Sequence, residues 1–75
     1  MYHTIEFATD FVVDMEISPR QPLERMRIQK GTRVQVQIKS YIVETADGPV
    51  EVADLFFEDG TATRQVRWEH MALVD

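Results

Sequence analysis

The chain has 75 residues, of which 44% are apolar and 28% are charged, and its formal net charge is −5. This length supports one small domain, residues 1–75, and leaves little room for a substrate pocket walled by the chain itself. The absence of cysteine excludes a disulfide scaffold, a thiolate metal cluster and a cysteine nucleophile. No apolar run reaches the length of a membrane span and no secretory signal opens the chain, so we expect a cytoplasmic protein without a membrane partner.

The N-terminal part of the chain predicts short strands separated by a loop. Apolar residues of one parity predict an extra edge strand within residues 1–10, and residues 11–17 alternate between apolar and polar side chains. Two prolines place residues 18–22 in a loop, because proline lacks a backbone donor. Residues 23–30 fit either a short helix or a strand, and we prefer the strand.

The segment after Gly31 carries the clearest alternation in the chain and predicts a half-buried antiparallel strand. Its two expected faces are Val34, Val36, Ile38 and Ile42 on the apolar side and Arg33, Gln35, Gln37, Lys39 and Tyr41 on the polar side.

The remaining residues predict a meander. A turn at residues 46–49 leads to a strand over residues 50–57, in which Val50, Val52 and Phe56 alternate, and an Asp-Gly turn leads to a strand over residues 63–68. Phe56 and Phe57 must point to opposite faces, so at least one ring leaves the interior. A short 3-10 turn at residues 69–71 and a last strand at residues 72–74 follow. Five to six short antiparallel strands with such turns predict an all-β protein that closes into a small barrel.

At the level of apolar spacing, residues 11–75 resemble an SH3-like barrel. Residues 11–17 are similar to the opening strand of SH3 domains and share its acidic positions, Asp14 and Glu16. Residues 26–31 resemble the stretch that ends at a glycine turn, and residues 66–75 match the spacing of the 3-10 turn and final strand. The resemblance implies an SH3-like barrel of five to six strands with one 3-10 turn near the C-terminus.

The chain departs from SH3 domains in the groove that grips polyproline ligands between aromatic rings. The groove positions hold Val13, Met15, Arg67 and His70, and the double-tryptophan position falls near Val52 and Ala53. We therefore expect no binding of proline-rich peptides.

The sequence contains no pattern that predicts catalysis. His3 and His70 with Glu6 or Glu69 are too sparse to predict a metal site, neither serine lies in a nucleophile-elbow context, and the three glycines are isolated beside turns. We expect a chain that is not an enzyme and that has no cofactor, no metal and no catalytic residues.

Charge is distributed unevenly along the chain. Residues 20–39 carry six basic residues and one acidic residue, whereas the remainder carries two basic and twelve acidic residues. These charges either cancel across neighbouring strands or form a basic face made of Arg25, Arg27, Arg33 and Lys39. Such a face predicts an acidic protein partner, or weak salt-sensitive self-association through Asp47, Glu51, Glu58 and Asp59.

We therefore expect a non-enzymatic protein-binding or assembly module. The alternatives are a nucleic-acid-binding small barrel that uses the basic face, or an accessory subunit of a larger enzyme; nucleic acid is disfavoured because only Tyr41 adds a ring to that face. Trp68 is either an exposed anchor or a cap on the barrel. The candidate partner-binding residues are Arg25, Arg27, Arg33, Lys39, Phe57, Trp68 and His70.

Overall fold

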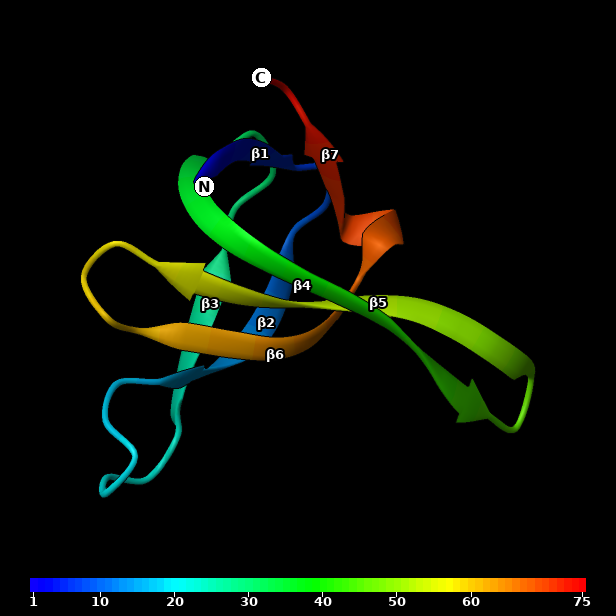
Figure 1. The fold of residues 1–75 in the computed structure, drawn as a ribbon, viewed down its shortest axis with the longest axis horizontal. Helices are drawn as coiled ribbons and strands as arrows, with labels where there is room; N and C mark the ends of the chain where they lie inside the picture. Colours follow the sequence, from blue (N-terminus) through cyan, green and yellow to red (C-terminus); the bar gives the residue numbers. More distant parts are fainter.

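The computed structural model describes residues 1–75 as a single antiparallel sheet of seven strands with one 3-10 turn (Figure 1). The elements are β1 (His3–Phe7), β2 (Phe11–Glu16), β3 (Glu24–Ile28), β4 (Arg33–Thr45), β5 (Gly48–Phe57), β6 (Ala62–Arg67), the 3-10 turn η1 (Trp68–His70) and β7 (Met71–Leu73).

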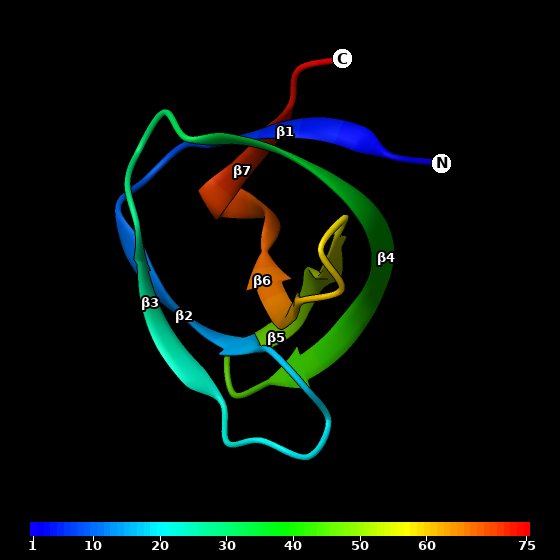
Figure 2. The ribbon, with the colours of Figure 1, turned by 90° about the vertical axis from the view of Figure 1, so that its left-hand side faces the viewer.

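The sheet curls into a half-barrel with the strand order β3-β2-β6-β5-β4-β1-β7 (Figure 2). The prediction of an all-β antiparallel fold with one 3-10 turn near the C-terminus is confirmed. The expected strand number was too low, since seven strands form. The expected closure was wrong, because β3 and β7 are the two ends of the sheet and do not pair.

The N-terminal strand β1 is not at an edge. It pairs with β4 on one side and with β7 on the other, with Ile5 opposite both Val34 and Leu73. The C-terminal segment therefore closes against β1, and β2 instead pairs with β3 and, briefly, with β6. Residues 23–30 adopt the preferred strand, as β3, and the 3-10 turn lies one residue earlier than expected.

The core lies inside the curl and gathers side chains from five strands. Its fully buried members follow the period of two, as Ile5 and Phe7 do in β1 and as Ala53 and Leu55 do in β5. The buried core residues are Ile5, Phe7, Val36, Ala53, Leu55, Val66 and Met71.

The β4–β5 hairpin extends beyond this core as an arm (Figure 1). Its ten residue pairs run from Val36 opposite Phe57 to Thr45 opposite Gly48, but β1 covers only the first part of β4. The expectation that Ile42 lies with the buried face was wrong: its side chain has the correct parity but is 66% exposed, because the strand has already left the core.

The two faces of β5 both carry apolar side chains. Phe57 lies opposite Val36 and packs against the core, whereas Phe56 lies on the outer face beneath the Arg64 guanidinium, 5.4 Å from the ring centre. The prediction that the Phe56 and Phe57 rings point to opposite faces of the strand is confirmed. The core face of β5 belongs to Ala53 and Leu55. Val50, Val52 and Phe56 lie on the opposite face of the strand, where Val52 is also buried.

The turn between β5 and β6 is fixed by its own side chains. Asp59 Oδ1 accepts hydrogen bonds from the Thr61 backbone N–H at 3.0 Å and from Thr61 Oγ1 at 2.6 Å, and Gly60 adopts a φ of +88°. These bonds lower the pKa of Asp59. No helix in the structure has the length and apolarity to cross a membrane.

Candidate protein-binding site

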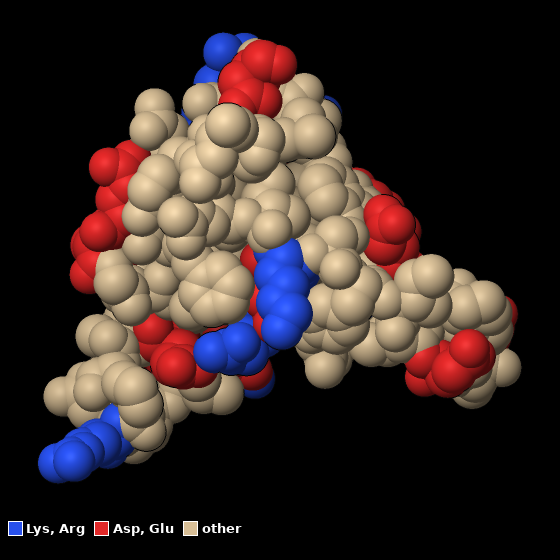
Figure 3. All heavy atoms as spheres, in the orientation of Figure 1, with Lys and Arg blue, Asp and Glu red and all other residues tan.

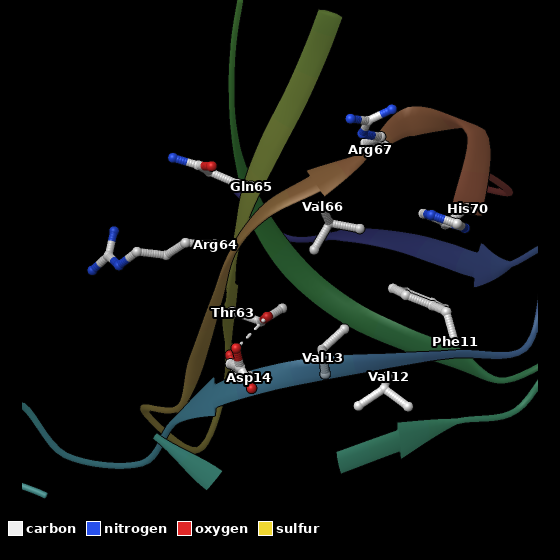
Figure 4. Close-up of a pocket in the computed structure, with 10 residues that line it drawn as sticks. All are labelled: Phe11, Val12, Val13, Asp14, Thr63, Arg64, Gln65, Val66, Arg67 and His70. Carbon is white, nitrogen blue, oxygen red and sulfur yellow. Dashed lines mark hydrogen bonds between the residues drawn. The ribbon is translucent and has the colours of Figure 1, made fainter. Parts of the chain in front are cut away.

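A groove of about 300 Å³ opens where β2 and β6 diverge (Figure 4). The two strands pair only at Met15–Thr63 and Glu16–Ala62, and beyond this point the Thr63 hydroxyl donates to the carbonyl of Asp14 at 3.1 Å in place of a backbone bond. Thr63 and Val66 point from β6 toward Val13, while Arg64 and Gln65 extend to the other side of β6. We call this opening the β2–β6 groove.

The β2–β6 groove brings together three of the four residues that the sequence resemblance predicted at a polyproline groove. Val13, Arg67 and His70 line it, whereas Met15 is buried beside it. The His70 ring stacks on Phe11 with ring centres 4.5 Å apart and planes 7° apart, and a 2.7 Å hydrogen bond joins His70 Nδ1 to Thr9 Oγ1. Each ring thus covers one face of the other, so little flat aromatic surface remains for a proline ridge.

The residues predicted at the double-tryptophan position are buried. Val52 and Ala53 are 2% and 0% exposed and cannot touch a ligand. Trp68 packs partly against the core and donates its indole N–H to Ser40 Oγ at 3.1 Å. Its ring is half-buried, which fits a cap on the barrel end more closely than a free anchor.

The four predicted basic residues do not share one face. Three strands, β2, β6 and β5, lie between β3, which carries Arg25 and Arg27, and β4, which carries Arg33 and Lys39. The expectation of neighbouring strands was wrong because a short connection at Gly31 joins two strands that do not pair. Arg33 is bonded to Glu6 at 2.9 Å, and Lys39 has no ion-pair partner.

The edge strand β3 is the most exposed strand of the sheet. Only Ile28 is partly buried, and the four residues before it are exposed. Arg25 contacts Asp14 at 3.6 Å, with both side chains mostly in solvent, and Arg27 has no ion-pair partner. Its side chains alternate, since Met26 lies opposite the buried Val13 and Arg25 lies opposite the exposed Asp14.

Beside β3, on the inner face of the curl, an apolar cleft of about 290 Å³ is open to solvent. Phe57, a predicted site residue, forms part of its wall, together with the core residue Phe7. The apolar lining consists of Phe7, Met15, Ile17, Met26, Ile28, Val34 and Phe57, and the rim consists of Thr32, Asp59 and Thr61. We call this space the β3 cleft.

A buried carboxylate, Asp54, organises the outer face of the β4–β5–β6 meander. Its Oδ1 accepts from the Tyr41 hydroxyl at 2.8 Å and from the Gln65 backbone N–H at 3.0 Å, and its Oδ2 pairs with Arg64 at 3.2 Å. Gln65 occupies a β-bulge with a φ of +56°, so Asp54 satisfies the backbone donor that the bulge takes out of the ladder.

The hydrogen bonds around Asp54 shift the pKa values of both Asp54 and Tyr41. Burial alone raises the pKa of Asp54, but the hydrogen bonds from Tyr41, Gln65 and Arg64 outweigh it, and the pKa lies below its usual value. The hydrogen bond to Asp54 and burial raise the pKa of Tyr41. The shifts favour an ionised Asp54 with both oxygens engaged and a protonated Tyr41.

Sequence reasoning missed this network, although a signal was present. Asp54 is the one charged residue in the run Val52–Phe57, and a lone carboxylate in an apolar strand needs partners. The two-residue turn at positions 46–47 fixes the hairpin register, which sets Tyr41 diagonally across from Asp54.

The end of the arm is acidic. Figure 3 shows acidic atoms and no basic ones at the end of the β4–β5 hairpin, where Glu44, Asp47 and Glu51 have no ion-pair partners. The loop between β2 and β3, with Arg20, lies at the other end of the molecule (Figure 1).

No three histidine, aspartate or glutamate side chains are grouped as metal ligands would be. In comparisons with known proteins, no family model matches the chain, and no curated protein and no solved structure matches it significantly.

Proposed function

We propose that this protein is a non-enzymatic protein-binding or assembly module that accepts an extended segment of a partner along the free edge of β3. The observation that supports the proposal is an exposed edge strand directly beside an open apolar cleft. Strand addition obtains affinity from backbone hydrogen bonds and specificity from pockets for alternate side chains, and β3 offers both.

The backbone of β3 has donors and acceptors free for a new strand. Because the Asp14 carbonyl points to β6, the backbone groups of Val13 and Met15 point to β3. Met26, opposite Val13, therefore bonds to β2, and the backbone groups of Arg25 and Arg27 point away from the sheet. An added strand would pair with these two residues.

The β3 cleft supplies the second element of such a site. Met26 and Ile28 lie on the inner face of β3 and line the cleft, so every second side chain of an added strand would enter it. Met26, Ile17 and Leu23 are 40%, 40% and 59% exposed, which leaves apolar surface for a partner to cover.

We further propose that the half-barrel is a divergent SH3-like barrel. The support is the order of its elements: the meander β4–β5–β6 leads through η1 to a last strand that pairs with the first strand. In this view the proline groove has lost its rings, and the edge of β3 has taken over the binding role.

Selection from a displayed library of random peptides tests the proposed function. Peptides enriched on the folded protein should bind in the micromolar range and slow amide hydrogen exchange at Arg25 and Arg27. The amide of Met26 provides an internal reference, because its N–H already bonds to β2.

Arg27→Pro should abolish binding, because proline removes the outward N–H without costing a bond to β2. Arg27→Ala removes the same charge but keeps the N–H and should retain binding. Peptides that protect the β2–β6 groove instead of β3, or a library that yields no binder, would overturn the proposal.

A further inference from the structure

We infer that the segment accepted by β3 alternates acidic and apolar residues, so the partner is a protein with an extended acidic–apolar stretch. This inference rests on the proposed strand addition and specifies the chemistry of its ligand. It follows from which side chains of β3 face each side of the sheet.

The outer face of β3 selects for acidic residues. A residue of the added strand that lies on this face sits next to Arg25 or Arg27, at the spacing at which cross-strand side chains interact. Arg27 and the nearby Lys30 have no ion-pair partner, and Arg25 has only the loose contact with Asp14. Asp10 lines a shallow cleft with Arg27 and Lys30 and accepts from the Lys30 backbone N–H at 2.6 Å, so the added strand meets cations that the protein compensates only in part.

The inner face of β3 selects for apolar residues. Glu24, Met26 and Ile28 lie on this face of β3, and beyond Met26 and Ile28 lies the β3 cleft with Phe57 on its far wall. A charged side chain there would lose water without gaining a partner, because only Asp59 brings a charge to the rim. Acidic and apolar side chains must then alternate along the ligand, since faces alternate along a strand.

The protein's own strand β2 follows this rule in part on the other edge of β3, since the apolar Val12 lies opposite Arg27. Asp14 lies opposite Arg25, and Val13 lies opposite Met26. Arg25 and Met26 face both of their neighbouring strands, so the acidic–apolar pair that β2 presents to them suits the free edge as well.

A second copy of the chain fits this edge poorly. Two β3 strands paired edge to edge would bring their arginines together, and like charges across a ladder are destabilising. The free edge of the arm offers Tyr41, Ile42, Val43 and Glu44, in which acids do not alternate with apolar residues. The matching pattern in β2 is held between β3 and β6.

Three matched peptides test the inference. The probe is Thr-Asp-Ile-Glu-Val-Asp-Ile-Thr, and the controls replace its acids by serine or by lysine. The acidic peptide should bind roughly 2- to 30-fold more tightly than the serine peptide, as expected for two exposed ion pairs, and the difference should shrink as salt rises. All binding is read from protection of the Arg25 and Arg27 amides.

The double variant Arg25→Glu with Arg27→Glu should reverse the preference, so that the lysine peptide binds most tightly. The double variant Arg25→Gln with Arg27→Gln adds no new charge and should bind the three peptides with equal affinity. Equal affinities for wild type would overturn the charge rule and leave strand addition standing. Protection by none of the peptides would overturn strand addition itself. Protection that grows with protein concentration in the absence of peptide would assign the edge to a second copy and overturn the inference.

Discussion

Replacing Asp54 by asparagine tests whether a buried carboxylate holds the β5–β6 bulge. Asparagine keeps one oxygen that can accept from Tyr41 and Gln65, but it presents an amide to Arg64 and carries no charge. A hydrogen bond to a charged group contributes roughly 1.5–3 kcal/mol. We expect Asp54→Asn to lower the free energy of unfolding by about 1–3 kcal/mol near neutral pH, because part of the network survives.

The loss should depend on pH in a defined direction. The pKa of Asp54 in the folded protein lies below the ordinary aspartate value of 3.8, so its ionised form stabilises the fold above that value, and this contribution disappears as pH falls through the folded pKa. The difference between wild type and Asp54→Asn should therefore be largest at neutral pH and should shrink below about pH 4.

Thermal unfolding followed by circular dichroism across this pH range measures the stability loss and its dependence on pH. A change of about 1 kcal/mol in the free energy of unfolding shifts the midpoint temperature of so small a domain by roughly 4–8 °C. Asp14→Asn is the matched control, because Asp14 pairs with Arg25 in solvent at 3.6 Å and such pairs contribute only about 0–1 kcal/mol. Equal losses for the two variants, or a loss from Asp54→Asn that does not change with pH, would refute the reasoning.

Four other outcomes are expected. Leu55→Ala should lower the free energy of unfolding by about 2–5 kcal/mol in urea titrations, since the side chain is fully buried, whereas Ile42→Ala should change it little. Gln65→Val should destabilise the protein by about 1–2 kcal/mol in the same assay, because a β-branched residue tolerates the positive φ poorly, and Gln65→Gly should not. Arg25→Thr combined with Arg27→Thr should dimerise in sedimentation velocity, because the charges that keep two β3 edges apart are gone; a monomer would contradict this. Proline-rich peptides should bind no more tightly than about millimolar in calorimetry, and micromolar binding would show that the β2–β6 groove works without rings.

Local patterns predicted the strands because each depends on residues close in the sequence. The period of two placed Val13 and Met15 inward, and the proline pair placed the loop before β3. The turn residues at Asp47-Gly48 and Asp59-Gly60 then located the meander. These features need no knowledge of which strands pair.

The pairing of distant strands could not be read in the same way. Gly31 joins β3 to β4 through a short connection that suggests neighbours, yet β4 pairs with β5 and β1 while β3 pairs only with β2. For this reason the four residues of the predicted basic face do not form a single surface. The divergence of β2 from β6, which creates the groove at His70, also depends on a contact between residues far apart in the chain.

The pairing of β1 with β7 has a consequence for the order in which the protein folds. The β4–β5 hairpin, closed by a two-residue turn, can form within about 1–10 μs once its strands are available. The partners of Ile5 and Phe7 in β7 are Leu73 and Met71, so synthesis at about 5–20 residues per second separates the two strands by roughly 3–13 s. Once β4 has been made, a nascent chain can pair β1 with β4 while the other side of β1 waits for β7. A chaperone or a neighbouring nascent chain that competes for the free side of β1 would therefore act after β4 and β5 are made and before β7 is made.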